Sequence, residues 1–349
     1  MSVPKWILFG AVALFSSIGI AAMAKKGKNH AGKGPSVKES AMAKTTPVLS
    51  VPGAVKNIDK KNFSKEERQS QANPLPTPSS RPVVAGKDDF PTIDRVFQLF
   101  TANPSKLPIV ETITYASSVS WLKGRPAWIA DYAAYYNTSR HFIARSLNNG
   151  PDYFTQRVIE GSRFNVFRKD KKINFHLLVD ISRCKMGFYY IDLDTNERVL
   201  LKTYRVGLGR IDATKPSGTL TPLGRYVLGS RVAIYKPGMM GYFQDNQVEM
   251  IRIFGTRWIP LEQQLDGVTV STKGYGLQGA PWVVNAEKGQ LVENREVIGA
   301  YESNGCICLN SEDLEELFAI VLTRPTFIEV VKDFREAKLP GVEVATPSR

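Results

Sequence analysis

The pattern of apolar and polar positions changes three times along the 349-residue chain. Residues 6–24 form one uncharged apolar run, and residues 25–88 are polar, rich in proline and without a periodic pattern. From residue 89 to 170 apolar residues recur at helical spacing, whereas after residue 171 they tend to alternate with polar ones. The chain therefore predicts a small helical subdomain (89–170), a mostly β domain (171–333) and a charged tail (334–349).

Three stretches carry the helical signal. They are PTIDRVFQLF (91–100), RPAWIADYAAYY (125–136) and TSRHFIARSL (138–147). Pro126 suits the first turn of the second stretch, because a missing N–H costs nothing there. His141 lies in the third stretch, where a single histidine is more typical of packing or surface exposure than of catalysis.

Short alternating runs separated by Gly, Pro, Asp and Asn indicate the β domain. The expected strands are INFHLLVDI (173–181), GFYYID (187–192), RVLLKTYRVGLG (198–209), GRYVLGSRVAIY (224–235), EMIRIFG (249–255), GVTVST (267–272) and TFIEVV (326–331). One helix is expected among them, NSEDLEELFAIVL (310–322), because Asn310 or Ser311 can cap it and its apolar residues form one stripe. Pro325 ends this helix, and the charged residues after 333 are expected to fray.

The apolar run WILFGAVALFSSIGIAAMA (6–24) approaches the length of about 20 residues that spans a bilayer. It predicts membrane targeting, either as a signal peptide cleaved after Ala24 or as an uncleaved anchor. Lysines directly after the run oppose the positive-inside rule for an exported chain. A domain that faces the cytoplasm therefore stays open as an alternative.

The net charge of the chain bears mainly on the interpretation of residues 25–88. The chain carries +13, with 46 Lys and Arg against 33 Asp and Glu, and 13 basic and 5 acidic residues fall within residues 25–88. Most of the excess thus lies in a segment too polar to bury a core, which we interpret as a disordered basic linker. With Phe63 as its single aromatic and no recognition motif, the linker does not predict nucleic-acid binding.

The candidate chemistry lies in ESNGCICLN (302–310), where Cys306 follows Gly305. A thiol in a glycine turn near a helix start is typical of a nucleophile, because backbone N–H groups can stabilise an oxyanion there. A free cysteine is as often a small buried hydrophobe, and the residues alone leave both interpretations open. The cysteines, Cys184, Cys306 and Cys308, are too few and too irregularly spaced for a disulfide scaffold or a zinc cage.

Four stretches in sequence resemble the catalytic domain of L,D-transpeptidases, the cell-wall enzymes that use a cysteine to cross-link peptidoglycan. They are LLVDISRCKMGFYYID (177–192), KPSGTLTPLGRYVLG (215–229), YGLQGAPW (275–282) and ESNGCICLN (302–310). The second resembles the family's Thr-Pro-x-Gly-x-Tyr turn, the third its His-x-Ala-Pro-Trp segment, and the fourth its Ser-His-Gly-Cys signature. The resemblance implies an L,D-transpeptidase-type β-sandwich with one capping helix.

Carried over by position, the resemblance implies that Cys306 is the nucleophile and that Gly305 shapes its turn. Gln278 occupies the place of the family's general-base histidine. Asn304 replaces the second histidine of the signature, and Cys308 stands where the family usually has Arg or Asn. The residues expected to bind substrate are Ser303, Asn304, Cys308, Gly279 and Trp282. We expect the Cys306 sulfur at the mouth of a peptide-sized groove, beside the Gln278 amide.

The resemblance implies peptidoglycan remodelling as the function, without a metal or an organic cofactor. Cys306 would attack the amide after the third stem-peptide residue, release D-alanine and hold the acyl group as a thioester. An amine of a second stem would then form a 3–3 cross-link, or water would complete trimming. The expected partners are peptidoglycan stem peptides and, through the N-terminal segment, the membrane, on the periplasmic side of the inner membrane.

Two other hypotheses remain at this stage. Gln278 cannot accept a proton as a histidine can, so the second hypothesis is a catalytically inactive protein of the same fold that binds peptidoglycan or scaffolds a cell-wall complex. The third is an adaptor that binds an anionic surface through the linker. Reactivity of the Cys306 thiol separates the first two, and deletion of residues 25–88 separates the third.

Overall fold

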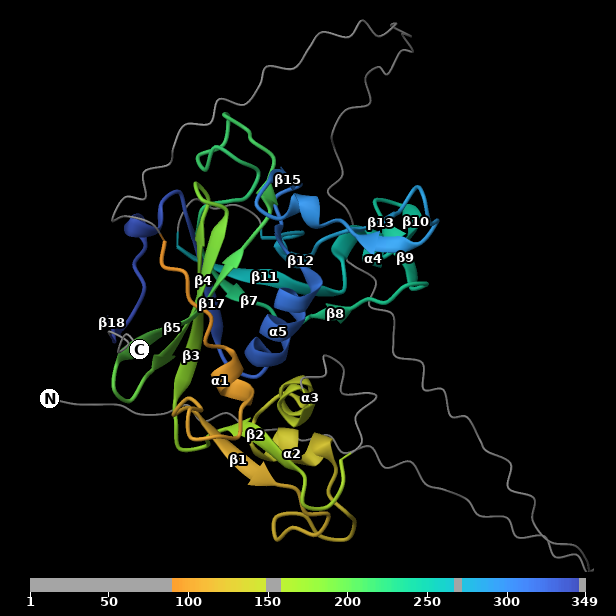
Figure 1. Ribbon diagram of the computed structural model, residues 1–349. Helices are drawn as coiled ribbons and strands as arrows, with labels where there is room; N and C mark the ends of the chain where they lie inside the picture. The colour runs from red at the N-terminus through yellow and green to blue at the C-terminus, as the bar shows by residue number, and fades with distance from the viewer. Residues whose placement is uncertain (1–89, 149–157, 267–271, 345–349) are drawn as a thin grey trace, which may run out of the picture. The chain divides into compact units, whose positions relative to one another are not determined.

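The strands that follow residue 172 join into one curled sheet of ten strands (Figure 1). The computed structural model describes residues 90–148, 158–266 and 272–344. In spatial order the strands are β16 (Ile307–Leu309), β12 (Gly276–Gly279), β11 (Arg257–Asp266), β7 (Gly224–Leu228), β17 (Thr326–Val331), β3 (Ile173–Asp180), β4 (Lys185–Asp192), β5 (Glu197–Arg205) and β18 (Val342–Glu343), and β8 (Ala233–Ile234) pairs with β11. The domain is mostly β, as predicted, but its main strands form one continuous curled sheet where a two-sheet sandwich was expected.

β3 is apolar along most of its length because both faces of the sheet are covered there. Phe175, Leu177 and Val179 belong to the main core, whereas Leu178 joins a smaller cluster on the opposite face. Successive side chains of a strand point to opposite faces, so a strand buried on both sides has a nearly continuous apolar sequence.

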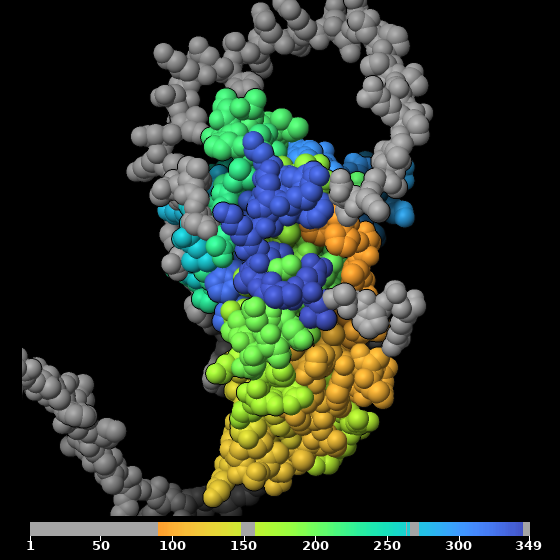
Figure 2. Space-filling model, turned by 90° about the vertical axis from the view of Figure 1, so that its left-hand side faces the viewer, coloured from red at the N-terminus to blue at the C-terminus, as the bar shows by residue number. Residues whose placement is uncertain are grey.

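The C-terminal residues close the smaller cluster. In η3 (Phe334–Glu336), Phe334 packs on Phe90 with ring centroids 5.0 Å apart, and β18 pairs in parallel with β5. Figure 2 shows the C-terminal residues, in dark blue, lying across this side of the domain. The prediction of a frayed tail was therefore wrong for residues 334–344, because their apolar side chains cover a sheet face.

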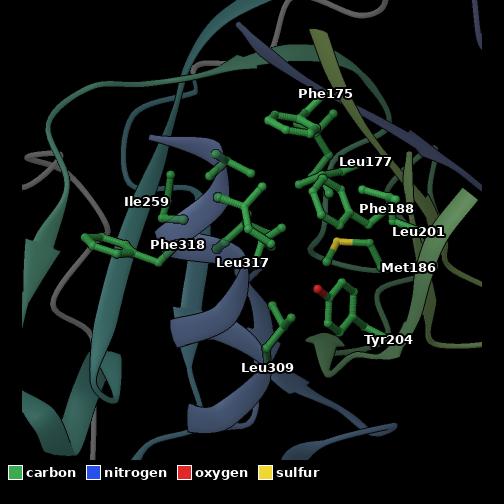
Figure 3. Packing of buried hydrophobic residues seen from close by; sticks show 14 of the residues in the cluster. Phe175, Leu177, Met186, Phe188, Leu201, Tyr204, Ile259, Leu309, Leu317 and Phe318 are labelled. Atoms are coloured by element: carbon green, nitrogen blue, oxygen red, sulfur yellow. The ribbon is translucent and has the colours of Figure 1, made fainter. Parts of the chain in front are cut away.

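α5 (Ser311–Val321) packs against the sheet and completes the main core, as its predicted apolar stripe requires. Asn310 caps it, since Asn310 Oδ1 accepts the Asp313 N–H at 2.8 Å. Figure 3 shows Phe318 beside Ile259 of β11, and Leu317 directed toward Met186 and Phe188 of β4. Full burial of one such side chain contributes about 1.5–3 kcal/mol.

The residues before 170 form three short helices and a two-stranded ribbon. The helices are α1 (Phe97–Phe100), α2 (Ile129–Tyr135) and α3 (Arg140–Asn148), and the ribbon pairs β1 (Val110–Thr114) with β2 (Arg163–Phe167). The helices confirm the predicted helical stretches, whereas the ribbon was not predicted. Phe142 and Phe167 lie in the same core as the sheet, and the Ser139 hydroxyl donates to Ala319 O of α5. This part therefore packs directly on the β domain.

Short elements near one end of the sheet were missed or misassigned by the sequence pattern. EMIRIFG, predicted as a strand, contains the helix α4 (Ile251–Phe254), which ends where Gly255 adopts φ +61°. A residue with positive φ commonly ends a helix, and glycine adopts it without strain. The ribbons not predicted are β9 (Met240–Phe243) with β10 (Asn246–Glu249), and β13 (Trp282–Val284) with β14 (Leu291–Glu293).

Several predictions fall on other parts of the chain. The apolar run 6–24, the linker 25–88 and most of the predicted strand 267–272 lie outside the described residues. Within the described residues, which belong to one compact unit, none of the helices has the length and apolarity needed to cross a bilayer.

Candidate active site

Cys306 lies in a tight turn between two short strands. β15 (Tyr301–Ser303) pairs in parallel with β6 (Leu208–Gly209), and β16 begins one residue after Cys306. The Ser303 hydroxyl closes the turn: it accepts the Gly305 N–H at 3.1 Å and donates to Cys306 O at 2.6 Å. Ser303 and Gly305 thus shape the turn, and the hydroxyl of Ser303 is engaged inside it.

Position 305 requires glycine, both because of its backbone conformation and because of the atoms packed around it. Its φ is +110°, which side chains with a Cβ rarely adopt. A Cβ at this position would lie 2.4 Å from Tyr275 Cε1 and 2.7 Å from Leu220 O. A Cβ at Gly209 would in turn lie 2.9 Å from Gly305 Cα. Three chain segments therefore meet at the turn that carries Cys306.

The Cys306 thiol is held by the backbone of residues 274–276. Its Sγ donates to Gly274 O at 3.5 Å, and the Gly276 N–H bonds to the sulfur. Cys306 is 8% exposed, and this burial raises the pKa of its thiol to about 11, although the Gly276 N–H acts in the opposite direction. With that pKa only about one thiol in 10⁴ is ionised at pH 7.

Gln278 lies on β12 but does not bond to Cys306. It pairs in register with Cys308, and its Nε2 donates to Ile253 O at 3.2 Å. The Gln278 side chain also bonds to the Cys308 thiol. The expected open groove at the sulfur was therefore wrong, because Cys306 is buried, whereas the place of the Gln278 amide as its neighbour stays a prediction. In the structure the sulfur of Cys306 is buried and contacts the backbone of residues 274–276.

Cys308 belongs to a small apolar cluster. It is 2% exposed and packs with Ala280 and Val297, on the face of β16 opposite to Ile307 and Leu309, which enter the main core. Burial raises the pKa of the Cys308 thiol to about 12. Cys308 therefore lies beneath the surface in this structure, and its expected contact with substrate stays a prediction.

The other expected site residues differ in exposure. Asn304 is exposed at the tip of the turn, whereas Gly279 is buried, where a Cβ would approach Thr256 N to 2.9 Å. Trp282, at the start of β13, is half-buried, and its Nε1 is buried without a hydrogen-bond partner among the described residues. Their roles in binding substrate stay predictions.

Neither histidine of the described chain packs beside Cys306. His141 lies against Phe318 of α5, with ring centroids 5.3 Å apart, on the face opposite to Cys308. His176 stacks on Phe327 at 5.0 Å, and its strand, β3, lies five positions from β16 in the sheet. The described residues therefore place no imidazole where it would deprotonate the thiol.

Gly274, Tyr275 and Gly276 were missed as neighbours of the nucleophile. The ring of Tyr275, a residue that was not among the expected site residues, packs over Gly305. The parallel pairing of Leu277 with Ile307 would have revealed these neighbours, because this register sets Gly276 beside Cys306. That pairing joins residues 30 positions apart, and a single sequence does not show it.

The described residues contain no cluster of three or more His, Cys, Asp or Glu side chains that would hold a metal ion. The expectation that no cofactor takes part stays a prediction.

Residues 174–331 match the family model of the L,D-transpeptidase catalytic domain, of the YkuD type. This match confirms the resemblance seen in the four sequence stretches. The β domain is therefore similar to the catalytic domain of L,D-transpeptidases over residues 174–331.

Two solved structures also match. The helical cell shape determining protein Pgp2 from Campylobacter jejuni is 17% identical, with a TM-score of 0.32, over 49% of this chain and 51% of that chain. Bd1075 from Bdellovibrio bacteriovorus is 13% identical, with a TM-score of 0.31, over 46% of this chain and 48% of that chain. The match thus spans about half the length of each, and at these scores it carries no argument. The comparison with curated proteins gave no match.

Proposed function

We propose that the domain acts on peptidoglycan stem peptides as an L,D-transpeptidase, with Cys306 as its acyl-accepting nucleophile. The family match of residues 174–331 supports the substrate class. The observation that carries the proposal is the position of Cys306 in the glycine turn after β15, with the Gly276 N–H on its sulfur. A backbone N–H at that place favours the thiolate over the thiol.

The proposed reaction has two steps. The Cys306 sulfur attacks the amide carbonyl carbon between the third and fourth stem residues, and the C–N bond breaks. The thiol proton leaves on the amine nitrogen of D-alanine, and the acyl group stays on the sulfur as a thioester. An amine of a second stem then displaces the sulfur to give a 3–3 cross-link, or water displaces it to leave a trimmed stem.

Two features of the site make this reaction slow. A thiol of pKa about 11 is ionised about 300-fold less at neutral pH than a free cysteine of pKa about 8.5. A positioned general base contributes about 10²–10⁴ in rate, and Gln278 provides none. The Sγ contact with Gly274 O must also break before a substrate carbonyl can reach the sulfur. We therefore expect acylation only after substrate has displaced residues 274–276.

The proposed substrate also fixes a location. Stem peptides are found in the cell envelope, so the domain would work on the periplasmic side of the inner membrane. Residues 1–24 would act there as a signal peptide or as an anchor.

A second candidate function is stem-peptide binding without chemistry. The specific observation in its favour is that the Cys306 thiol is buried, bonded to a carbonyl and without a proton acceptor at its side. In this case Cys306 fills space in the turn.

Incubation of the full chain with disaccharide-tetrapeptide separates the two functions. Slow release of D-alanine by the wild-type chain, and none by Cys306→Ser, supports the transpeptidase. Undiminished binding of the tetrapeptide without any release of D-alanine over days supports the binding protein and contradicts the transpeptidase.

A further inference from the structure

Residues 117–127, before α2, form a surface loop whose two ends lie side by side. Ala127 N–H donates to Ser117 O at 2.7 Å, and the Tyr115 hydroxyl donates to Ala127 O at 2.6 Å. A compact surface loop of about 6–16 residues with adjacent ends is an Ω-loop, and such loops are frequently functional. These hydrogen bonds give the loop a fixed base.

Two side chains of the loop attach it to α2. The ring of Trp121 is stacked on that of Tyr135, with centroids 4.4 Å apart, and meets the ring of Tyr132 edge-on at 5.1 Å. Arg125 binds both carboxylate oxygens of Asp131, at 2.8 and 2.5 Å. Aromatic pairs and bidentate guanidinium–carboxylate pairs both restrict orientation. The shape of the loop is therefore set before any ligand binds.

The loop surrounds a pocket of about 570 Å³, which lies within the size range of small-ligand sites. Its polar lining comes from Ser117, Ser118, Ser120, Lys123 and Arg125. Within the described residues the three serine hydroxyls form no hydrogen bond and Lys123 forms no ion pair, and no carboxylate lines the pocket. The pocket therefore offers unused hydrogen-bond donors to a ligand rich in hydroxyl and carbonyl oxygens.

An exposed indole follows the pocket in the chain. Pro126 lines the pocket, Ala127 is fully buried, and Trp128 is 64% exposed. Trp128 has an extended backbone, with φ −111° and ψ 167°, and alternate side chains of an extended segment point to the same side. The indole therefore projects outward on the side of Pro126, where it contributes little to the core.

A sugar ring matches these two surfaces. One face of a pyranose consists of C–H groups, which pack on an aromatic ring, and its edge carries hydroxyl groups, which need hydrogen-bond partners. A chain of sugars can thus place one ring on the indole and another among the serine hydroxyls and the ammonium group. A cationic ligand, by contrast, would find no carboxylate among the described residues of the lining.

We propose that this pocket and Trp128 bind the glycan strand of peptidoglycan. The identity of the sugar rests on the proposed function, because the stem peptides are attached to chains of N-acetylated amino sugars. Figure 1 shows α2, which anchors the loop, and β15, which precedes Cys306, at opposite ends of the described unit. Glycan and stem would therefore not compete, and holding the glycan would raise the local concentration of stems.

The test measures binding of chitotetraose, a soluble oligomer of N-acetylglucosamine without stem peptides, to the full chain by calorimetry. The wild-type chain and Cys306→Ser should bind it equally, because the pocket is separate from the sulfur. Trp128→Ala should weaken binding at least about tenfold through loss of the stacked ring, and Trp128→Phe should recover part of the affinity. Lys123→Met should weaken binding about two- to tenfold through loss of a donor.

Phe97→Ala is the matched control, because Phe97 is 57% exposed but lies on α1, outside the loop. It should bind chitotetraose as the wild-type chain does. No binding by the wild-type chain overturns the inference, whereas the proposed function depends on the release of D-alanine and would stand. Binding that neither Trp128→Ala nor Lys123→Met weakens also overturns it, because the sugar would then occupy another site.

Discussion

Two groups that can carry charge, the half-buried Lys202 and the buried Cys306, have opposite surroundings. Lys202 Nζ lies 2.9 Å from Asp313 Oδ1 and 2.8 Å from Glu316 Oε1, both on α5, and 3.3 Å from Asp94 Oδ2. Burial alone would lower the pKa of Lys202, but Glu316 and Asp313 raise it above its ordinary value. The Cys306 sulfur has backbone partners only, and burial raises the pKa of its thiol to about 11.

The difference shows which charge this fold stabilises. The sheet, α5 and the residues before α1 each contribute to the charged cluster around Lys202, and so hold three parts of the chain together. No comparable group faces Cys306 among the described residues, so its thiol stays neutral. The fold therefore stabilises the charge of Lys202, whose ion pairs connect three parts of the chain. It does not stabilise a negative charge on the sulfur of Cys306.

The largest effect is expected from giving Cys306 the missing base. Gln278→His restores an imidazole at the family's general-base position, and we expect the rate of adduct formation with a carbapenem to rise about 10²–10⁴-fold. Intact-mass spectrometry over time measures this rate. Gln278→Asn is the control, since a second amide cannot accept the proton and should not raise the rate. An unchanged rate in Gln278→His would show that burial by residues 274–276, and not the missing base, limits the reaction.

Removal of the charge at the other site should destabilise the fold. Lys202→Met leaves Asp313 and Glu316 without their cation, and breaking a buried pair in this way costs about 3–5 kcal/mol. The free energy of unfolding in urea measures the loss. Arg168→Gln breaks the exposed pair with Asp170 and should leave the free energy of unfolding nearly unchanged, because water screens such a pair. Equal effects of the two variants would contradict the structural role of Lys202.

A third group, the buried His176, extends the comparison to the stability of the fold at acidic pH. Burial against Phe327 lowers the pKa of His176 to about 4, from an ordinary value of about 6.5. The unfolded chain therefore binds the proton first as the pH falls. The contribution of His176 to stability is complete above pH 6.5 and is lost towards pH 4, by about 3 kcal/mol.

Urea titrations at pH 7 and pH 4 measure this loss. His176→Gln has no group that titrates in this range, so its stability should fall less than that of the wild-type chain over the same interval. An identical fall in both proteins would mean that His176 already carries its proton in the folded state.

The sequence predicted those parts of the fold that depend on local patterns. The Asn310 cap and the stripe of α5 follow from spacing within one helix, and β3 and β4 follow from short apolar runs. The helix α4 was missed because its isoleucines alternate as in a strand, and the ribbon β1–β2 joins segments more than 45 residues apart. Local periodicity contains neither kind of information.

The candidate site was predictable in identity but not in geometry. The glycine turn and Cys306 are contiguous in sequence, so motif and structure agree on them. The backbone groups that hold the sulfur come from residues 274 and 276, and the bond of Gln278 to Ile253 O depends on where α4 lies. These contacts arise from packing between segments that are distant in sequence. Matching single residues to the positions of a family motif does not reveal such packing.

The pH dependence of Cys306 alkylation most directly tests whether the nucleophile is kept neutral. Iodoacetamide reacts with the thiolate, and peptide mass mapping separates Cys306 from Cys184 and Cys308. With a pKa of about 11, the labelling rate of Cys306 should rise about tenfold per pH unit from pH 7 to pH 10 without reaching a plateau. A plateau with its midpoint at or below about pH 8.5, the value of a free cysteine, would contradict the account, because it would mean that the folded chain activates the thiol.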